Sequence, residues 1–167
     1  MGRIGRTNGQ AAVEVLSYAA FFLLVFVTSV AVFLQLQEQE LSRAENAYAQ
    51  QVAYQFADYI ETAFISGPGF SEKVTMPSDI HGKPYTITIS RALGGAGGQE
   101  TGFVYVDWRG PVHESSFSAP TITADYQPVI YSGFIYTNSI GSIVINASKG
   151  WLVMIENRNG TVWFSRG

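Results

Sequence analysis

The sequence predicts an α+β fold. One long N-terminal helix, membrane-spanning in its lower half and amphipathic in its upper half, packs on a C-terminal antiparallel β-sheet or small β-sandwich. Residues 15–34 form an apolar run without a formal charge, and no glycine or proline occurs from Gln10 to Ser66. From Phe70 onward, short segments rich in Val, Ile, Thr and aromatic residues alternate with turn residues. The 167 residues therefore divide into a helix over 10–66 and a β-rich domain over 70–167.

The apolar run from Val15 to Leu34 is 20 residues long, and a helix needs about 20 apolar residues to cross a bilayer core. One alternative is a buried helix of a soluble domain, but a domain of this size could not cover such a helix on every side. Another is a secretory signal peptide, whose apolar region is typically about 7–15 residues and ends at a small-residue cleavage site. We therefore interpret residues 15–34 as a retained transmembrane segment.

The charges that flank this segment predict its orientation. Arg3 and Arg6 precede it, whereas Gln35, Glu38 and Glu40 follow it. Because basic residues favour the cytoplasmic side, we expect the N-terminus in the cytoplasm and the rest of the chain outside. Without the two arginines, 8 basic residues stand against 13 acidic ones, so the exported part carries a net charge of about −5.

The helical pattern continues beyond the membrane segment. A single helix from Ala11 to Phe64 would hold 54 residues and be about 80 Å long, ending at Ser66-Gly67-Pro68-Gly69. A membrane anchor joined to a separate stalk helix is the alternative. We expect Tyr48, Val52, Phe56 and Ile60 to pack on the β domain. They belong to an apolar face with spacings of three and four, made of Leu41, Ala44, Tyr48, Val52, Phe56, Tyr59, Ile60 and Ala63.

The C-terminal part contains about seven strand candidates separated by turn residues, as in a meandering antiparallel sheet or small sandwich. The clearest hairpin joins 152–156 to 161–164, because Asn159-Gly160 suits a tight turn with positive φ at both central residues. The candidate strands are residues 85–91, 103–108, 121–126, 129–136, 140–146, 151–156 and 161–164.

The composition argues against several classes of function. The chain has no cysteine, which excludes disulfides, cysteine zinc sites and thiol catalysis. Its net charge of −3 comes without a basic cluster, so we expect no nucleic-acid partner. His81 and His113 lie in separate loops without a second ligand at metal spacing, and no serine sits in a nucleophile elbow. The glycine-rich stretch 93–98 lacks the Lys-Ser/Thr order of a phosphate loop and is interpreted as a surface loop. We expect no enzyme activity, metal or cofactor.

Two N-glycosylation sequons lie on the side predicted to be exported. They are Asn146-Ala147-Ser148 and Asn159-Gly160-Thr161, which makes Asn146 and Asn159 candidate glycosylation sites. Asn159 also has the turn role described above. The aromatic residues of this domain, among them Trp108 and Tyr126, could stack on sugars, but such residues more typically fill a small core or a subunit contact.

The segment Gly9-Gln10-Ala11-Ala12-Val13-Glu14, followed by the apolar run, resembles a class III signal peptide. The order of features is a short leader with basic residues, then Gly9 and Gln10, and then a carboxylate, Glu14, four residues after Gln10. In these features the first third of the chain resembles the type IV pilin superfamily, particularly archaeal pilins. Gln10 departs from the phenylalanine usual in bacterial members and fits the archaeal pattern, whereas Thr7 and Asn8 separate the arginines from Gly9.

The resemblance implies a processing site and an assembly residue. A prepilin peptidase would remove residues 1–9 by cutting between Gly9 and Gln10, and Glu14 would become the fifth residue of the mature chain. In bacterial members a carboxylate at this place is thought to pair with the N-terminal amine of a neighbouring subunit. An alternative explanation of Glu14 needs no resemblance to a family. A carboxylate in the first turns of a helix interacts favourably with the positive end of the helix dipole.

These observations lead us to expect a structural subunit of a pilus-like filament. Its partners would be identical subunits, the prepilin peptidase and a membrane assembly platform. It would lie in the cell membrane as a precursor and then in an extracellular filament that adheres to surfaces. The alternative is a membrane-anchored extracellular module that binds a surface layer, a sugar or an archaellum-type motor. A minor pilin lies between the two.

Overall fold

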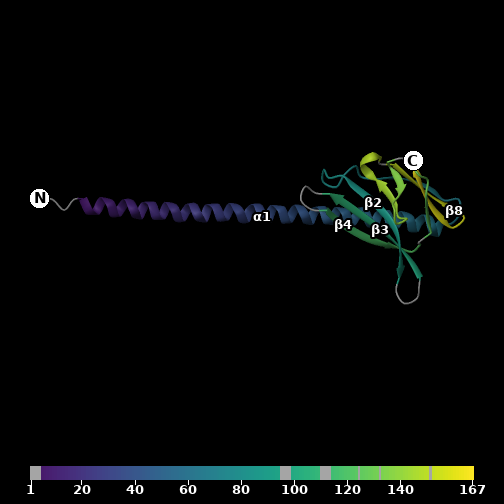
Figure 1. Ribbon diagram of the computed structural model, residues 1–167, viewed down its shortest axis with the longest axis horizontal. Coiled ribbons are helices and arrows are strands. Elements are labelled where there is room, and N and C mark those ends of the chain that lie inside the picture. Colours follow the sequence, from purple (N-terminus) through teal and green to yellow (C-terminus); the bar gives the residue numbers. More distant parts are fainter. Residues whose placement is uncertain (1–4, 95–98, 110–113, 124, 132, 151) are drawn as a thin grey trace. The chain divides into compact units, whose positions relative to one another are not determined.

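A computed structural model describes residues 5–94, 99–109, 114–123, 125–131, 133–150 and 152–167 (Figure 1). Within these ranges, residues 5–9, 92–94, 99 and 114 are described by their backbone. The fold is α+β, as expected: one long helix is followed by β-sheets. The chain divides into two compact units, Met1–Ala44 and Glu45–Gly167.

The helix α1 runs from Gly5 to Ser66, 62 residues. It begins before the expected Ala11, because Thr7, Asn8 and Gly9 do not interrupt it. An interior glycine costs a helix only about 1 kcal/mol relative to alanine. The expected C-terminus is confirmed. Gly67 follows with φ of 79°, and its N–H donates to the carbonyl of Phe64 at 3.3 Å.

The β-strands form two sheets. The first has the order β1-β8-β9-β5, and its β5–β9 pair is parallel: β1 (Ser71–Thr75), β8 (Leu152–Arg158), β9 (Thr161–Arg166) and β5 (Tyr126–Pro128). The second is antiparallel throughout, with the order β4-β3-β2-β7-β6 (Figure 1): β4 (Glu114–Thr121), β3 (Gln99–Arg109), β2 (Tyr85–Gly94), β7 (Ile143–Asn146) and β6 (Ile135–Thr137). The short 3₁₀ helix η2 (Ala147–Lys149) follows β7.

Both sheets and the last part of α1 share one core. The ring of Phe56 stacks on that of Phe164 in β9 with centroids 6.1 Å apart, and Tyr54 contacts Phe117 in β4 at 5.7 Å. Burial on the helix begins at Glu45, so the expected Leu41 and Ala44 are exposed instead. The buried apolar helix residues are Ala49, Val52, Ala53, Phe56, Ala57, Ile60 and Ala63.

Two of the expected strands are wrong. In the expected strand 121–126, Thr121 ends β4 and Tyr126 begins β5, and the described residues Ile122, Thr123 and Asp125 belong to no strand. The chain passes here from one sheet to the other. In 129–136 the described residues before Ile135 lie outside the strands, and a turn at Gly133, with φ of 75°, leads into β6. Sequence reasoning also missed β1 and β4, whose serines, charged residues and proline give little strand signal.

The β8–β9 hairpin forms as expected. Asn159 and Gly160 have φ of 55° and 93°, and Arg158 pairs with Thr161 across a two-residue turn. Asn157 joins this turn to the helix. Its side-chain Oδ1 accepts from Gly160 N–H at 2.9 Å, and its Nδ2 donates to the carbonyls of Ala63 at 2.9 Å and Phe64 at 3.3 Å. These carbonyls lie in the last turn of α1, where no further helical N–H is available.

Asn157→Ala is expected to lower the free energy of unfolding by about 2–3 kcal/mol, because it leaves the buried carbonyl of Ala63 and the N–H of Gly160 without their side-chain partner. Asn157 is only 2% exposed, so water does not replace the lost amide. Urea denaturation of the detergent-solubilised chain, followed by tryptophan fluorescence, measures the change. Gln127→Ala, which truncates an exposed amide in β5, is the control. Equal midpoints for the two variants would contradict this role.

The loop between β1 and β2 fastens to the helix through a buried charge. Glu45 is 6% exposed, and its Oε1 accepts from Lys83 Nζ. The tight turn at His81-Gly82, with φ of 50° and 78°, places His81 against the ring of Tyr48 at 5.6 Å. Glu45 was not part of the apolar face expected from the sequence. Its spacing to Ala49 and Val52, four and then three, would have placed it on the buried face.

Candidate functional site

The first part of α1 presents an uninterrupted apolar surface. No residue of its most apolar stretch is buried, and the helix is long and apolar enough to cross a membrane. The exposed fractions of its large side chains lie between 40% at Val30 and 72% at Leu16. Such a surface is larger than the apolar patches that soluble monomers typically expose.

Three hydroxyl groups of this surface are hydrogen-bonded within the helix. The hydroxyl of Ser17 donates to the carbonyl of Val13 at 2.8 Å, and that of Ser29 donates to Val25 at 2.7 Å. Thr28 donates in the same way to Leu24 at 2.5 Å. Because these hydroxyls bond the preceding turn, they add little cost when the helix enters an apolar environment.

The three residues of the expected processing and assembly site lie in the first turns of α1. The peptide between Gly9 and Gln10 is helical, and Gln10 and Glu14 are exposed. The amide Nε2 of Gln10 lies 3.5 Å from Oε1 of Glu14, one helical turn away, which is a weak hydrogen bond. Among the residues that the structure describes, Glu14 has no ion pair. It is therefore a carboxylate at the edge of the apolar surface without a cationic partner.

The two sequon asparagines differ in their surroundings. Asn159 is exposed at the tip of the β8–β9 hairpin. Asn146 ends β7 and caps η2: its Oδ1 accepts from Ser148 N–H at 3.1 Å and from Ser148 Oγ at 2.6 Å. Both of these bonds are made by Oδ1, and within the described parts of the chain the Nδ2 atom of Asn146 has no hydrogen-bond partner.

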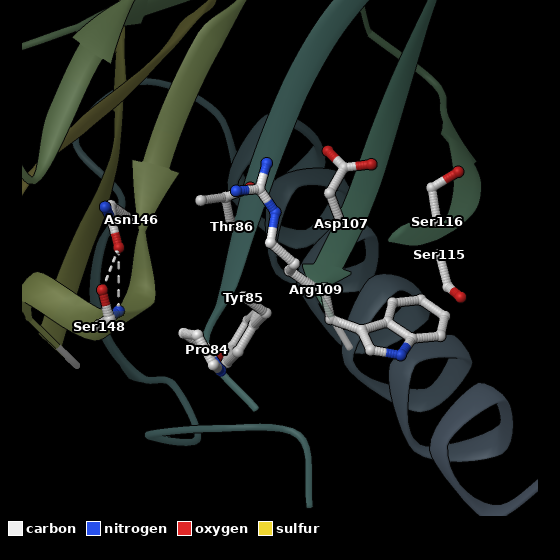
Figure 2. A pocket seen from close by; sticks show the side chains of 10 residues that line it. Pro84, Tyr85, Thr86, Asp107, Arg109, Ser115, Ser116, Asn146 and Ser148 are labelled. Carbon is white, nitrogen blue, oxygen red and sulfur yellow. Dashed lines mark hydrogen bonds between the residues drawn. The ribbon is translucent and has the colours of Figure 1, made fainter. Parts of the chain in front are cut away.

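A hollow of about 460 Å³ lies beside Asn146 (Figure 2). Strands β2, β3, β4 and β7 bring polar residues to it, and the figure shows Asn146 and Ser148 on one side and Asp107 and Ser116 on the other. The lining residues are Pro84, Tyr85, Thr86, Asp107, Trp108, Arg109, Ser115, Ser116, Asn146 and Ser148. Sequence analysis named Asn146 but missed this group. The signal was the alternation in 85–91 and 103–108, which puts Thr86 and Asp107 on the outer face, but the strand register is not visible in sequence.

The structure also describes some of the other residues that the sequence analysis considered as ligand-binding or metal-binding groups. His81 belongs to the turn described above, whereas His113 and glycines 95, 97 and 98 lie outside the described residues. Asp79 Oδ1 accepts from Gly82 N–H at 2.7 Å, and this bond lowers the pKa of Asp79. Within the described chain no three His, Asp or Glu residues lie together as metal ligands. Trp108 and Tyr126 are buried, each 3% exposed, as core residues.

No protein-family model matches the chain, and none of the curated proteins or solved structures matches it significantly. Its architecture nevertheless agrees in general terms with the resemblance. A long, apolar N-terminal helix whose C-terminal part packs on β-sheets is the general architecture of type IV pilins.

Proposed function

We propose that this chain is a structural subunit of an extracellular, type IV pilus-like filament that serves adhesion to surfaces. The observation that carries the proposal is the exposed apolar surface of α1, which begins with a single carboxylate, Glu14, and is otherwise uncharged to Leu36. The β-rich unit, Glu45–Gly167, would form the outer part of the filament.

The apolar surface favours two successive partners. Burial of a large apolar side chain stabilises by about 1.5–3 kcal/mol, so this surface strongly favours either a bilayer or other apolar helices. A bilayer covers it in the newly made chain. In a filament, the same helices of identical subunits would cover one another, and the hydrophobic effect would drive the assembly.

Glu14 supports this reading because an isolated carboxylate is costly in an apolar assembly. A cut after Gly9 would create an ammonium group on Gln10 and remove Arg3 and Arg6. The loss of these arginines would release the chain from the cytoplasmic side of the membrane. The new ammonium of a neighbouring subunit would supply the cationic partner that Glu14 lacks among the described residues.

The partners follow from this sequence of events. A prepilin peptidase would cut the precursor in the membrane, and a membrane assembly platform would move the mature subunit into the filament. The N-terminus of the precursor would face the cytoplasm, and the β-rich unit would lie outside.

Electron microscopy of filaments sheared from cells, with identification of their peptides, tests the function. We expect this chain to be the repeating subunit of a filament whose core contains the helices. If the chain stays with the membrane and no filament contains it, the alternative of a membrane-anchored extracellular binding module replaces the proposal. Its presence as a rare component would indicate a minor pilin.

Processing provides a separate prediction. Mass spectrometry of the exported protein should find Gln10 as the first residue, as a free amine or cyclised. Gly9→Leu should block the cut and leave the leader on most molecules, because a bulky side chain replaces the residue before the scissile bond. Gly5→Leu changes another leader glycine and should be cut normally. A wild-type chain that begins at Met1 or Gly2 would refute the processing site.

A further inference from the structure

The register of the second sheet aligns four polar side chains in one row across four strands. Asn146 in β7 pairs with Thr86 in β2, Thr86 pairs with Asp107 in β3, and Asp107 pairs with Ser116 in β4. Neighbouring strands are about 4.8 Å apart, so the row spans about 14 Å. Because paired residues point to the same face, all four face away from the core on which Ile87 and Val106 lie.

This row forms one wall of the 460 Å³ hollow, which is large enough for a small ligand (Figure 2). Thr86, Asp107 and Asn146 are half-buried, and Ser116 is exposed. Arg109 and Ser148 complete the polar lining, and Pro84, Tyr85 and Trp108 also line the hollow. The hollow thus combines a polar row with an apolar surface of comparable size.

Two groups of the row are oriented in advance. Thr88 Oγ1 donates to Asp107 Oδ2 at 3.3 Å, and Ser148 donates twice to Asn146 Oδ1. A group held in place before binding loses less conformational freedom when a ligand arrives. The bonds to Oδ1 also fix the amide plane of Asn146, and therefore the direction of its Nδ2.

The chemistry of the lining selects a class of ligand. A carboxylate only accepts hydrogen bonds and a guanidinium only donates them, whereas hydroxyl and amide groups do both. The opposite charges of Asp107 and Arg109 cancel, so the hollow does not favour a strongly charged ligand. Every hydroxyl of a neutral polyhydroxylated molecule can donate and accept a hydrogen bond. The faces of its ring are apolar. We propose that this hollow is a saccharide-binding site.

Two sources could supply the saccharide. One is an external glycan, for which the hollow would be an adhesive site on the β-rich unit. The other is a glycan carried by Asn146 itself, whose Nδ2 is the acceptor atom of a sequon at the edge of the hollow. The chemistry of recognition is the same in both cases, and the test separates them.

The first arm uses the full chain, produced in a bacterial host without N-glycosylation and kept in detergent micelles. Neutral oligosaccharides of glucose, galactose, mannose and N-acetylglucosamine are screened on an array, and the binders are measured by calorimetry. Asp107→Asn should weaken binding about tenfold or more, because it converts a pure acceptor into a group that also donates. Ser116→Ala should weaken it less. Ser118→Ala removes the next outward hydroxyl of β4, outside the hollow, and should change nothing.

The second arm uses the native protein. Mass spectrometry identifies a glycan on the peptide containing Asn146, and mild periodate oxidation measures how well the hollow protects it. If the hollow holds this glycan, Asp107→Asn should raise the oxidation rate about tenfold, and Ser118→Ala should leave it unchanged. Thermal denaturation confirms that the variants are folded.

The site is supported by binding of an external oligosaccharide or by protection of a glycan at Asn146. In either case Asp107→Asn should abolish the effect, and Ser118→Ala should preserve it. The site is refuted if no oligosaccharide binds at millimolar concentration and Asn146 carries no glycan. It is also refuted if the two variants behave alike. Both arms are measured on single subunits, so their failure is distinct from a failure of filament assembly.

Discussion

Gly102→Ala is expected to lower the free energy of unfolding of the β-rich unit by about 3 kcal/mol or more, because it overpacks the core. A methyl group at this buried position of β3 would lie 1.7 Å from the hydroxyl oxygen of Tyr126. It would also lie 2.3 Å from both Thr121 Oγ1 and the carbonyl oxygen of Thr123. All three atoms belong to residues 121–126, which lead from one sheet to the other, so they cannot move far without disturbing the ends of β4 and β5.

The Tyr126 side chain explains why Gly102 must be small. Its hydroxyl donates to the carbonyl of Thr123 and shares a hydrogen bond with Thr121 Oγ1, directly over the glycine. Its ring packs against Phe164 with centroids 6.2 Å apart, and burial raises its pKa. Since a domain is stable by only about 5–15 kcal/mol, this single methyl group should remove a substantial part of the stability.

Urea denaturation of the detergent-solubilised chain, with Gly150→Ala as the control, tests this expectation. The three atoms nearest to the methyl group of Gly150→Ala belong to the Phe134 ring, at 3.0–3.2 Å, so a small shift should accommodate it at a cost of about 1 kcal/mol or less. Tyr126→Phe removes the nearest atom. The double variant Gly102→Ala/Tyr126→Phe should therefore lose less stability than the sum of the single variants. Equal losses for the two alanine variants would contradict the steric account.

Glu14→Ala is expected to reduce the yield of filaments about tenfold or more while the precursor still enters the membrane. The proposed pair with an N-terminal amine would lie in an apolar assembly, where loss of one partner leaves the other charge uncompensated. A tenfold change corresponds to about 1.4 kcal/mol for each subunit contact, a modest value for such a pair. Membrane insertion depends on the apolar run from Val15, which the substitution does not touch.

Quantification of sheared filaments and of the membrane fraction with one antibody measures both effects. Glu40→Ala is the matched control, because it removes an exposed carboxylate of the same helix beyond the apolar run. Glu14→Gln keeps the shape and removes the charge, so it separates pairing from packing. Unchanged filament yield in Glu14→Ala would leave Glu14 as a favourable helix-start residue only.

The local features of this protein could be predicted from its sequence because neighbouring residues determine them. The apolar run and the helical spacing required a long helix, and Gly67 with Pro68 ended it at Ser66. Asn159-Gly160 required the hairpin turn that joins β8 to β9. The processing site, the assembly role of Glu14 and the use of the sequons stay predictions, which the experiments above address.

Contacts between distant segments were decided only by the tertiary structure. Residues 121–126 have the sequence pattern of a strand, but β4 ends at Thr121 in one sheet and β5 begins at Tyr126 in the other, so the described residues between them belong to no strand. Glu45 meets Lys83, Asn157 reaches the end of α1, and Tyr126 lies over Gly102 across separations that no local pattern records. The polar row from Asn146 to Ser116 likewise exists only in the register of four strands. Periodicity assigns a side chain to a face, whereas hydrogen bonding between strands decides which side chains on that face become neighbours.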